Sequence, residues 1–385
     1  MKSNNKQLGN YIQLVDQRNS DLSITNLLGV SIEKKFIPSI ANIVGTDLSN
    51  YKIVRTGQFA YGPVTSRNGE KISIAYLDGE DCIISSSYTV FEVNKKDELD
   101  PEYLMLWFSR PEFDRYARYK SHGSVREIFD WTELCLVELP VPSIEEQRKI
   151  VKAYKTITDR IALKKQINDN LAAEVQALFV KMFGVYTSDI SVIKERSQTV
   201  FTMDDCCSFI SKGVTPQYTD DERIGEIILN QRCINNNQIN FGFCKRHIPK
   251  SKNEKWLQYG DILINSTGTG TLGRSAQYWG ESSDITVDSH ITIMRPKNDA
   301  LIYYLGTLCQ MLQSTFENMQ TGSTAQTDLP RERLKAMILG LPNDEQLTAF
   351  NSIAEKVVVR LQENLREVSL LQELQRTVVA TLSSH

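Results

Sequence analysis

The sequence is poor in the residue patterns that hold metal ions or form disulfide bonds. It has only 4 histidines and 7 cysteines in 385 residues, and no two cysteines stand in a C-x-x-C pair. The cysteines, which include the adjacent Cys206 and Cys207, therefore indicate free thiols and a reducing, cytoplasmic compartment. No apolar run follows the charged Lys2 and Lys6, so we expect no secretory signal.

The motifs of common catalytic classes are missing as well. The sequence contains no G-x-S-x-G, no H-E-x-x-H and no phosphate-binding G-x-x-x-x-G-K-[ST]. Adenine methyltransferases carry an Asp/Asn-Pro-Pro-aromatic motif, and this chain has no Pro-Pro pair. We therefore predict a protein that is not an enzyme and that uses no cofactor and no metal ion.

Positive charge is not in excess. The 44 Lys and Arg residues against 47 Asp and Glu residues give a formal net charge of −3. The sequence-independent part of nucleic-acid affinity grows with the number of phosphates that a protein neutralises. A chain of this charge is expected to bind nucleic acid weakly on its own.

The sequence does contain two long amphipathic stretches without proline or glycine, at residues 144–183 and 344–382. In both, the seam positions recur at alternating steps of four and three residues, which is typical of a coiled coil. The first seam comprises Ile150, Tyr154, Ile157, Ile161, Lys164, Asn168, Leu171, Val175, Leu178 and Met182. The second lies 200 positions later and comprises Phe350, Ala354, Val357, Leu361, Asn364, Val368, Leu371, Gln375, Val378 and Leu382. Charged residues stud both stretches, so neither is a membrane span, and each predicts the other as its partner.

Both seams become polar near the middle, at Lys164 and Asn168 in the first and at Asn364 in the second. In an antiparallel pair the midpoints meet, and these side chains would pair and fix the register at some cost in stability. The alternative is that they face solvent on bent helices.

The segments that precede the two stretches resemble each other, which predicts one unit present twice. Matching strands, a helical patch and a polar glycine turn recur in the same order. The matched pairs are 57–61 with 260–264, 86–91 with 289–294, 101–119 with 300–319, 121–126 with 321–326, and 139–142 with 339–342. We therefore predict an α/β (α+β) fold with two tandem domains separated by two long helices. The predicted limits are 1–142 and 185–341 for the domains, and 143–184 and 342–385 for the helices of a pseudo-two-fold antiparallel coiled coil.

The glycines at 268–273 match the dinucleotide fingerprint G-x-G-x-x-G and follow an apolar strand. That fingerprint must open a helix, whereas residues 274–279 have the pattern of a strand. A polar loop that contacts a phosphate or a base edge is the better interpretation. The first copy has a donor-rich loop in the corresponding place, at 62–71. An ordinary solvated hairpin loop better explains any single residue of it, and only the matched position of the two loops favours contact with DNA. Basic runs at 115–126 and 245–255 leave the same two alternatives open.

The repeated combination of Leu-Pro-Val-Pro at 139–142, Glu-Gln at 146–147 and a long helix resembles the specificity subunit of type I restriction-modification enzymes. Gly-Asp-Ile-Leu at 260–263, which leads to the glycine loop, and Gly-Val-Thr-Pro at 213–216 look like that family's target-recognition-domain motifs. The resemblance covers nearly the whole chain. The first copy departs from the pattern, because it lacks the Gly-x-Thr-Pro segment.

The resemblance implies a non-catalytic subunit that reads double-stranded DNA. Each domain would read one half of a split target, and the helix pair would set the gap between the halves. The implied partners are two modification subunits, which methylate adenine, and two restriction subunits, which translocate DNA; a membrane is not implied. The specificity module of a type II-like system and a coiled-coil scaffold whose globular ends bind proteins are the alternatives.

We expect the loops and turns of both copies to face the DNA. The residues predicted to bind DNA are Tyr61, Arg67, Asn68, Lys71, Ser124, Arg126, Thr267, Thr269, Arg274, Ser323 and Gln326.

Overall fold

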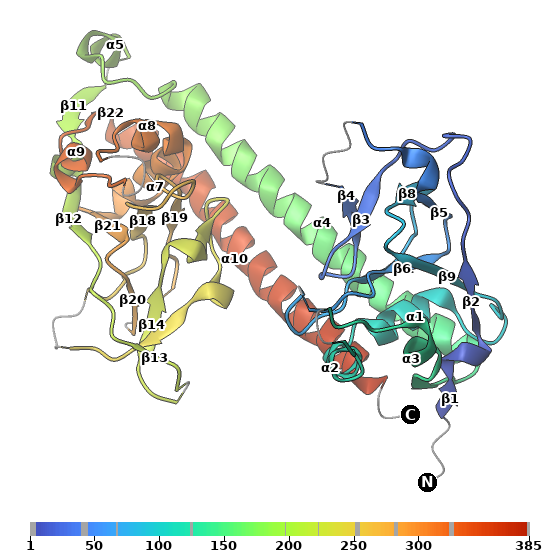
Figure 1. Ribbon diagram of the computed structural model, residues 1–385. Coiled ribbons are helices and arrows are strands. Elements are labelled where there is room, and N and C mark those ends of the chain that lie inside the picture. The colour runs from blue at the N-terminus through green and yellow to red at the C-terminus, as the bar shows by residue number, and fades with distance from the viewer. Residues whose placement is uncertain are drawn as a thin grey trace. The chain divides into compact units, whose positions relative to one another are not determined.

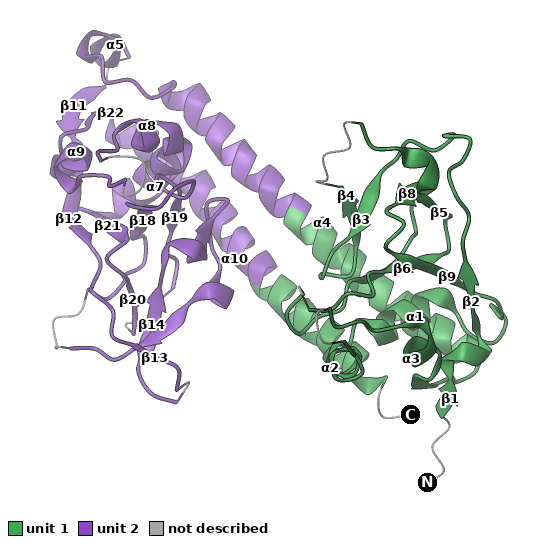
Figure 2. Ribbon diagram, in the orientation of Figure 1, with its two compact units in different colours: residues 1–165, 366–385 green, residues 166–365 purple. Residues whose placement is uncertain are grey.

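The computed structural model describes residues 5–39, 45–66, 68–123, 126–196, 198–221, 223–250, 255–280, 284–322 and 327–382 (Figure 1). The chain divides into two compact units (Figure 2). Unit 1 comprises residues 1–165 and 366–385, and unit 2 comprises residues 166–365. Both boundaries fall inside the long helices α4 (Ile144–Phe183) and α10 (Asp344–Thr381). The predicted domain limits, which lie at the helix ends, remain a prediction about the recognition domains.

The two long helices begin where the sequence predicts, but the Glu-Gln pair acts differently in each. At α4, the buried Gln147 side chain donates to the carbonyls of Glu98 and Pro142, both at 2.8 Å, and accepts from the Asp100 N–H. At α10, the Gln346 N–H donates to the Asn343 side chain at 2.9 Å, and the Gln346 side chain accepts from the Asn343 N–H. The second arrangement is a reciprocal cap, which satisfies donors that a helix start leaves unpaired.

Within each unit the two helices run antiparallel. In unit 1, Gln375 donates to Thr158 at 2.7 Å, and Lys164 pairs with Glu367 at 2.7 Å. Residues further along α4 therefore contact residues earlier in α10. In unit 2, Asn364 donates to Asn168 at 2.7 Å, and these side chains are 1% and 2% exposed. The predicted polar pairing is confirmed for the two asparagines, and the solvent-facing alternative is wrong for them.

The asparagine pair gives the first testable prediction. Replacing Asn364 by Leu leaves the buried Asn168 amide without this partner, and the expected cost is about 1–3 kcal/mol of unfolding free energy. The double variant N168L/N364L should recover most of that loss, because two apolar side chains replace a satisfied polar pair. Urea denaturation of the four members of the cycle measures the coupling. A loss in the double variant equal to the sum of the losses in the two single variants would contradict the pairing.

Unit 1 contains a four-stranded antiparallel sheet in the order β2-β9-β6-β7, with a helical layer on one face (Figure 1). The strands are β2 (Ile12–Val15), β6 (Phe59–Tyr61), β7 (Ile74–Tyr76) and β9 (Thr89–Val93); the helices are α1 (Pro101–Phe108), α2 (Pro111–Tyr119) and α3 (Trp131–Cys135). Aromatic side chains fill this core, and Phe59 stacks on Phe91 with ring centroids 4.9 Å apart. Smaller sheets pair β1 (Asn5–Gln7) with β10 (Glu138–Pro140), β3 (Leu28–Val30) with β4 (Phe36–Pro38), and β5 (Lys52–Val54) with β8 (Cys82–Ile84).

Unit 2 repeats this topology with other residues. Its main sheet has the order β12-β21-β18-β19, so each strand corresponds to one of β2-β9-β6-β7. These strands are β12 (Cys207–Lys212), β18 (Ile262–Asn265), β19 (Ser275–Gln277) and β21 (Ile291–Pro296); the helices are α7 (Ile302–Met311), α8 (Gln313–Asn318) and α9 (Arg331–Lys335). A second sheet joins β13 (Tyr218–Thr219), β17 (Lys245–His247), β14 (Glu226–Leu229) and β20 (Ile285–Val287), and β11 (Thr199–Thr202) pairs with β22 (Ile338–Leu341). The repeated unit predicted from the sequence is therefore present.

The remaining elements are short. They are η1 (Leu8–Asn10), η2 (Leu48–Asn50), α5 (Ile190–Glu195), α6 (Met203–Cys206), η3 (Gln231–Cys233), β15 (Ile234–Asn235), β16 (Gln238–Ile239), η4 (Phe241–Phe243) and η5 (Asp299–Leu301). Within the described ranges, no helix combines the length and the apolar character needed to cross a membrane.

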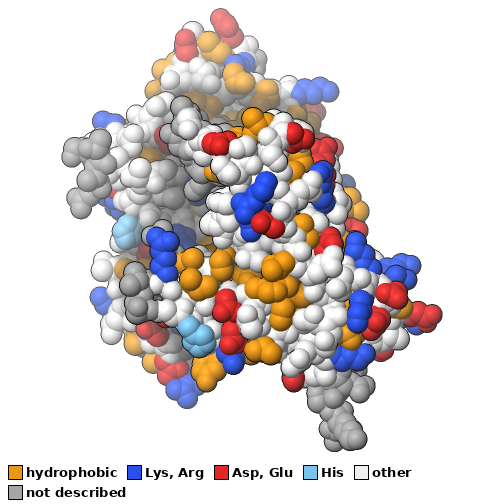
Figure 3. Space-filling view, turned by 45° about the vertical axis from the view of Figure 1, so that its right-hand side comes forward, with side chains coloured by type: hydrophobic (Ala, Val, Ile, Leu, Met, Phe, Trp, Pro, Cys, Tyr) orange, Lys and Arg blue, Asp and Glu red, His pale blue; other side chains and the backbone are white. Residues whose placement is uncertain are grey.

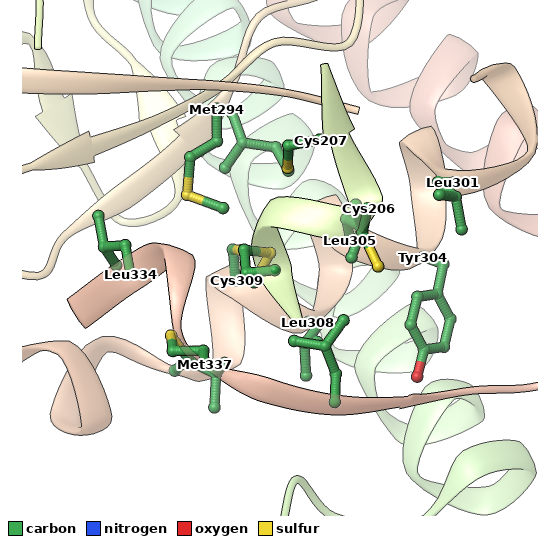
Figure 4. Close-up of a cluster of buried hydrophobic side chains, with 14 of the residues drawn as sticks. Cys206, Cys207, Met294, Leu301, Tyr304, Leu305, Leu308, Cys309, Leu334 and Met337 are labelled. Atoms are coloured by element: carbon green, nitrogen blue, oxygen red, sulfur yellow. The ribbon is translucent and has the colours of Figure 1, made fainter. Parts of the chain in front are cut away.

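The cysteines are free thiols, as predicted. Cys206, Cys207 and Cys309 lie in the core of unit 2 among leucine and methionine side chains (Figure 4). Burial raises the pKa of Cys309 to about 12 and that of Cys206 to about 11. These thiols are therefore protonated at neutral pH and act as small apolar side chains.

Candidate nucleic-acid interface

In unit 1, two donor-bearing segments that are far apart in the sequence lie side by side. The first is the loop at 62–73 after β6, and the second is the turn at 121–128 after α2. The backbone N–H of Thr65 donates to the Glu127 carbonyl at 2.9 Å, and its hydroxyl donates to Ser121 at 2.9 Å. Ile128 forms β-bridges with both Val64 and His122. The structure therefore brings together two segments that the sequence predicts to act together.

Unit 2 holds the corresponding segments in the same way. Asp328 forms β-bridges with both Thr267, in the loop after β18, and Thr321, in the turn after α8. The Leu329 N–H donates to the Ser266 carbonyl at 2.8 Å. Each unit thus presents a loop and a turn at equivalent places on one topology.

The loop of unit 2 is built on glycines with left-handed backbone. Gly268, Gly270 and Gly273 have φ angles of 98°, 74° and 82°, which residues other than glycine rarely adopt. The buried Asn265 amide braces the loop by donating to the carbonyls of Gln231 at 2.9 Å and Thr271 at 3.2 Å. Strand β19 follows, not a helix, so the fingerprint does not form the helix N-terminus that holds a dinucleotide.

The predicted residues of unit 1 have different surroundings. Tyr61 is fully buried in β6, so its side chain is not accessible to a ligand, contrary to the prediction; burial also raises the pKa of its hydroxyl. Asn68 is half-buried, Arg126 is exposed, and Lys71 is exposed and pairs with Glu33 at 2.8 Å. Arg67 and Ser124 lie outside the described residues.

In unit 2, Thr267 is half-buried and Thr269 is exposed in the glycine loop. The Arg274 guanidinium donates to the Gly270 carbonyl at 2.8 Å, and its side chain remains partly accessible. Arg274 thus braces the loop and keeps donors that can reach a ligand. Ser323 and Gln326 lie outside the described residues.

The structure adds a group of residues that the sequence interpretation did not single out. Lys212 pairs with Asp328 at 2.5 Å, beside the bridge to Thr267. His290 is half-exposed next to Asp288, and its carbonyl accepts from the Ser266 N–H at 2.8 Å. Of these residues, only Lys212 could have been found from the sequence, because it immediately precedes the Gly-Val-Thr-Pro segment at 213–216.

Carboxylates accompany many of the cations in these segments. Arg118 pairs with Glu127, and Lys120 pairs with Glu133 at 3.6 Å. On the face shown in Figure 3, the described Lys and Arg side chains are interspersed with Asp and Glu. Paired charges of this kind create only a weak electrostatic attraction for phosphate groups.

The described residues contain no group of three or more His, Cys, Asp or Glu side chains arranged to hold a metal ion. The donors of both units are amides, hydroxyls, guanidinium groups and ammonium groups. Such groups hydrogen-bond to base edges and phosphates.

Comparison with known proteins gives consistent results. The family model of the Type I restriction modification DNA specificity domain matches residues 31–173. The HindI type I restriction enzyme specificity subunit of Haemophilus influenzae is 26% identical over 158 residues, which are 40% of this chain and 34% of that relative. The matched region thus spans about a third of the relative's length.

One solved structure shares the fold over nearly the whole chain. The type I restriction-modification system S subunit from M. genitalium matches with a TM-score of 0.57 and 14% identity, covering 98% of this chain and 95% of that chain. The predicted resemblance and the predicted fold class are therefore confirmed.

Proposed function

We propose that this chain, a relative of the type I specificity subunits, is the DNA-recognition subunit of a type I restriction-modification enzyme. Each unit reads one part of a bipartite target, and the chain itself catalyses no reaction. The observation that carries this proposal is the convergence, in each unit, of a donor-bearing loop and turn at equivalent places on one topology.

The helix pair has two roles in this proposal. It sets the separation of the two half-sites, and it docks two adenine-methyltransferase subunits and two restriction subunits. Exposed apolar side chains on the helices support the docking role, since Leu163 of α4 and Leu370 and Leu374 of α10 are all exposed. Partners that add cations would also compensate for the net charge of −3.

A binding experiment separates this function from a protein scaffold. The chain and the methyltransferase subunit of its own operon are purified together and titrated with duplex DNA at several salt concentrations. We expect the complex to bind DNA and the isolated chain to bind it only weakly. A stable complex that binds no DNA at low salt would leave a scaffold as the function.

The proposal predicts an effect of Arg274 that is confined to one half-site. Replacing Arg274 by Ala should weaken binding to the target by ~1–3 kcal/mol and relax specificity in the half-site of unit 2 alone, because a bidentate contact to a base is lost. The matched control is Arg360→Ala, which removes an exposed arginine of α10 in the same unit. Equal losses on target and random DNA would contradict a base-reading role for Arg274.

A further inference from the structure

The connection between β14 and β17, residues 230–244, packs against the glycine loop of unit 2 through Gln231. The Gln231 carbonyl accepts from the Asn265 side chain at 2.9 Å, and the Gln231 side-chain Oε1 accepts from the Thr267 hydroxyl at 3.4 Å. A Cβ atom at Gly268 would lie 2.6 Å from this Oε1, so the amide lies directly against the loop backbone. The connection is therefore a third segment of the candidate interface in this unit.

The backbone of Gln231 is held from two sides. On the loop side, Asn265 binds its carbonyl. On the other side, the Asn230 side chain accepts from the Arg232 N–H at 2.9 Å and donates to the Phe243 carbonyl at 2.6 Å. These bonds do not involve the Gln231 side chain, so a substitution of that side chain leaves them in place.

The Gln231 amide keeps hydrogen-bonding capacity for a ligand. The residue is only partly buried, and its Oε1 has a second lone pair besides the one that accepts from Thr267. Within the described ranges, no acceptor is bound to its Nε2. The amide thus presents one donor and one acceptor side by side. The N6 amino group and N7 of adenine present the complementary pair in the major groove.

Unit 1 brings its equivalent connection to the equivalent loop. Strand β3 pairs with β4 as β14 pairs with β17, and the first strand of each pair also has a parallel partner, through the Leu27–Ile83 bridge in unit 1 and through β20 in unit 2. In unit 1 the connection is residues 31–35, where Glu33 pairs with Lys71 of the loop at 2.8 Å. An ion pair thus joins connection and loop in unit 1, and a neutral amide joins them in unit 2. A neutral amide suits a base edge better than a phosphate.

We propose that Gln231 reads an adenine in the half-site that unit 2 recognises, by accepting from the N6 amino group of the base and donating to its N7. This inference rests on the proposed function and adds a specificity-determining residue to it. Gly268 permits the contact, since a side chain at that position would displace the Gln231 amide from the loop.

The experiment uses the complex with the methyltransferase subunit and duplexes of its selected target. The half-site of unit 2 is the block that changes when residues 185–341 are exchanged. 7-Deazaadenine, which lacks the N7 acceptor and still pairs with thymine, replaces each adenine of both half-sites in turn. Wild-type protein and the variants Gln231→Ala, Gln231→Glu and Gln258→Ala are compared. Gln258 is an exposed glutamine before β18, at the opposite end of that strand from the glycine loop.

We expect Gln231→Ala to weaken binding of the unmodified target about 5- to 150-fold, which corresponds to the loss of one bidentate base contact. 7-Deazaadenine should weaken wild-type binding at a position of the unit 2 half-site where it has no effect on Gln231→Ala. Gln231→Glu keeps the acceptors and removes the donor, so it should favour cytosine at that position, whose N4 amino group donates. Gln258→Ala should bind as the wild type does. Unchanged melting temperatures show that the variants fold.

Three results overturn the inference while leaving the proposed function in place. They are unchanged target affinity of Gln231→Ala, an equal loss on target and random DNA, and a wild-type complex that tolerates 7-deazaadenine throughout the unit 2 half-site. The last of these needs no variant, so it stands even if a substitution impairs folding. In each case the wild-type complex still selects a bipartite target. If the wild-type complex selects no target, the proposed function fails and the inference fails with it.

Discussion

Replacing Asp261 by Ala is expected to lower the unfolding free energy by about 3–5 kcal/mol, because it leaves a largely buried charge without its partner. The Asp261 carboxylate is fully buried, and Arg295 donates to both of its oxygens, each at 2.8 Å. The Gln258 N–H donates to the same carboxylate at 2.8 Å. Asp261 lies just before β18, the strand that leads to the glycine loop, so the variant should also lose DNA binding.

Hydrogen exchange followed by mass spectrometry measures this effect and locates it. Peptides from β18 and β21 should lose protection, and peptides from β6 and β9 should keep it. The control is Asp221→Ala, which removes an exposed carboxylate that pairs with Arg223 at 2.8 Å. Exposed pairs contribute little, so the control should unfold like the wild type. If both variants behave alike, the Asp261 pair does not stabilise unit 2 as we describe.

The second large effect is expected at Phe350, where α10 enters the core of unit 2. The Phe350 ring lies 5.7 Å from Phe179 and 5.4 Å from Phe183, centroid to centroid, and all three side chains are buried. Truncation to Ala removes these contacts and leaves a cavity between α4 and α10, at an expected cost of about 3–5 kcal/mol.

Denaturation monitored by circular dichroism at 222 nm tests this prediction, because α4 and α10 contribute much of the helical signal. The matched control is Ile353→Ala, one turn further along α10, where the side chain is exposed. The control should cost far less, since its side chain leaves no cavity. A similar loss in both variants would mean that α10 packs on unit 2 through a different face.

The helix pair was the part of the fold that the sequence predicted best. A seam that recurs over some ten positions without proline or glycine has few alternative explanations, and α4 spans Ile144–Phe183 as predicted. The pairing of Asn168 with Asn364 was one of two alternatives that the sequence left open, and the structure decides for it.

The candidate interface could be predicted from the sequence only in part. Its loops were found because the repeat places them at matched positions, and their convergence on Ile128 and Asp328 depends on the fold. Tyr61 follows two apolar residues at the end of an interior strand, and nothing local distinguishes a buried ring from an exposed one. The carboxylates that pair with Lys71 and Lys212 lie 38 and 116 positions away, so the sequence could not show that these cations are paired.

The measurement that tests the central claim most directly is a selection from random duplex DNA by the complex of this chain with its adenine-methyltransferase subunit. We predict an enriched motif of two short specified blocks, with centres separated by about one helical turn of ~10 base pairs. Exchanging residues 185–341 for those of a relative should then change one block and leave the other unchanged. Stable co-purification without any enriched motif would contradict the claim that the two units read DNA sequence.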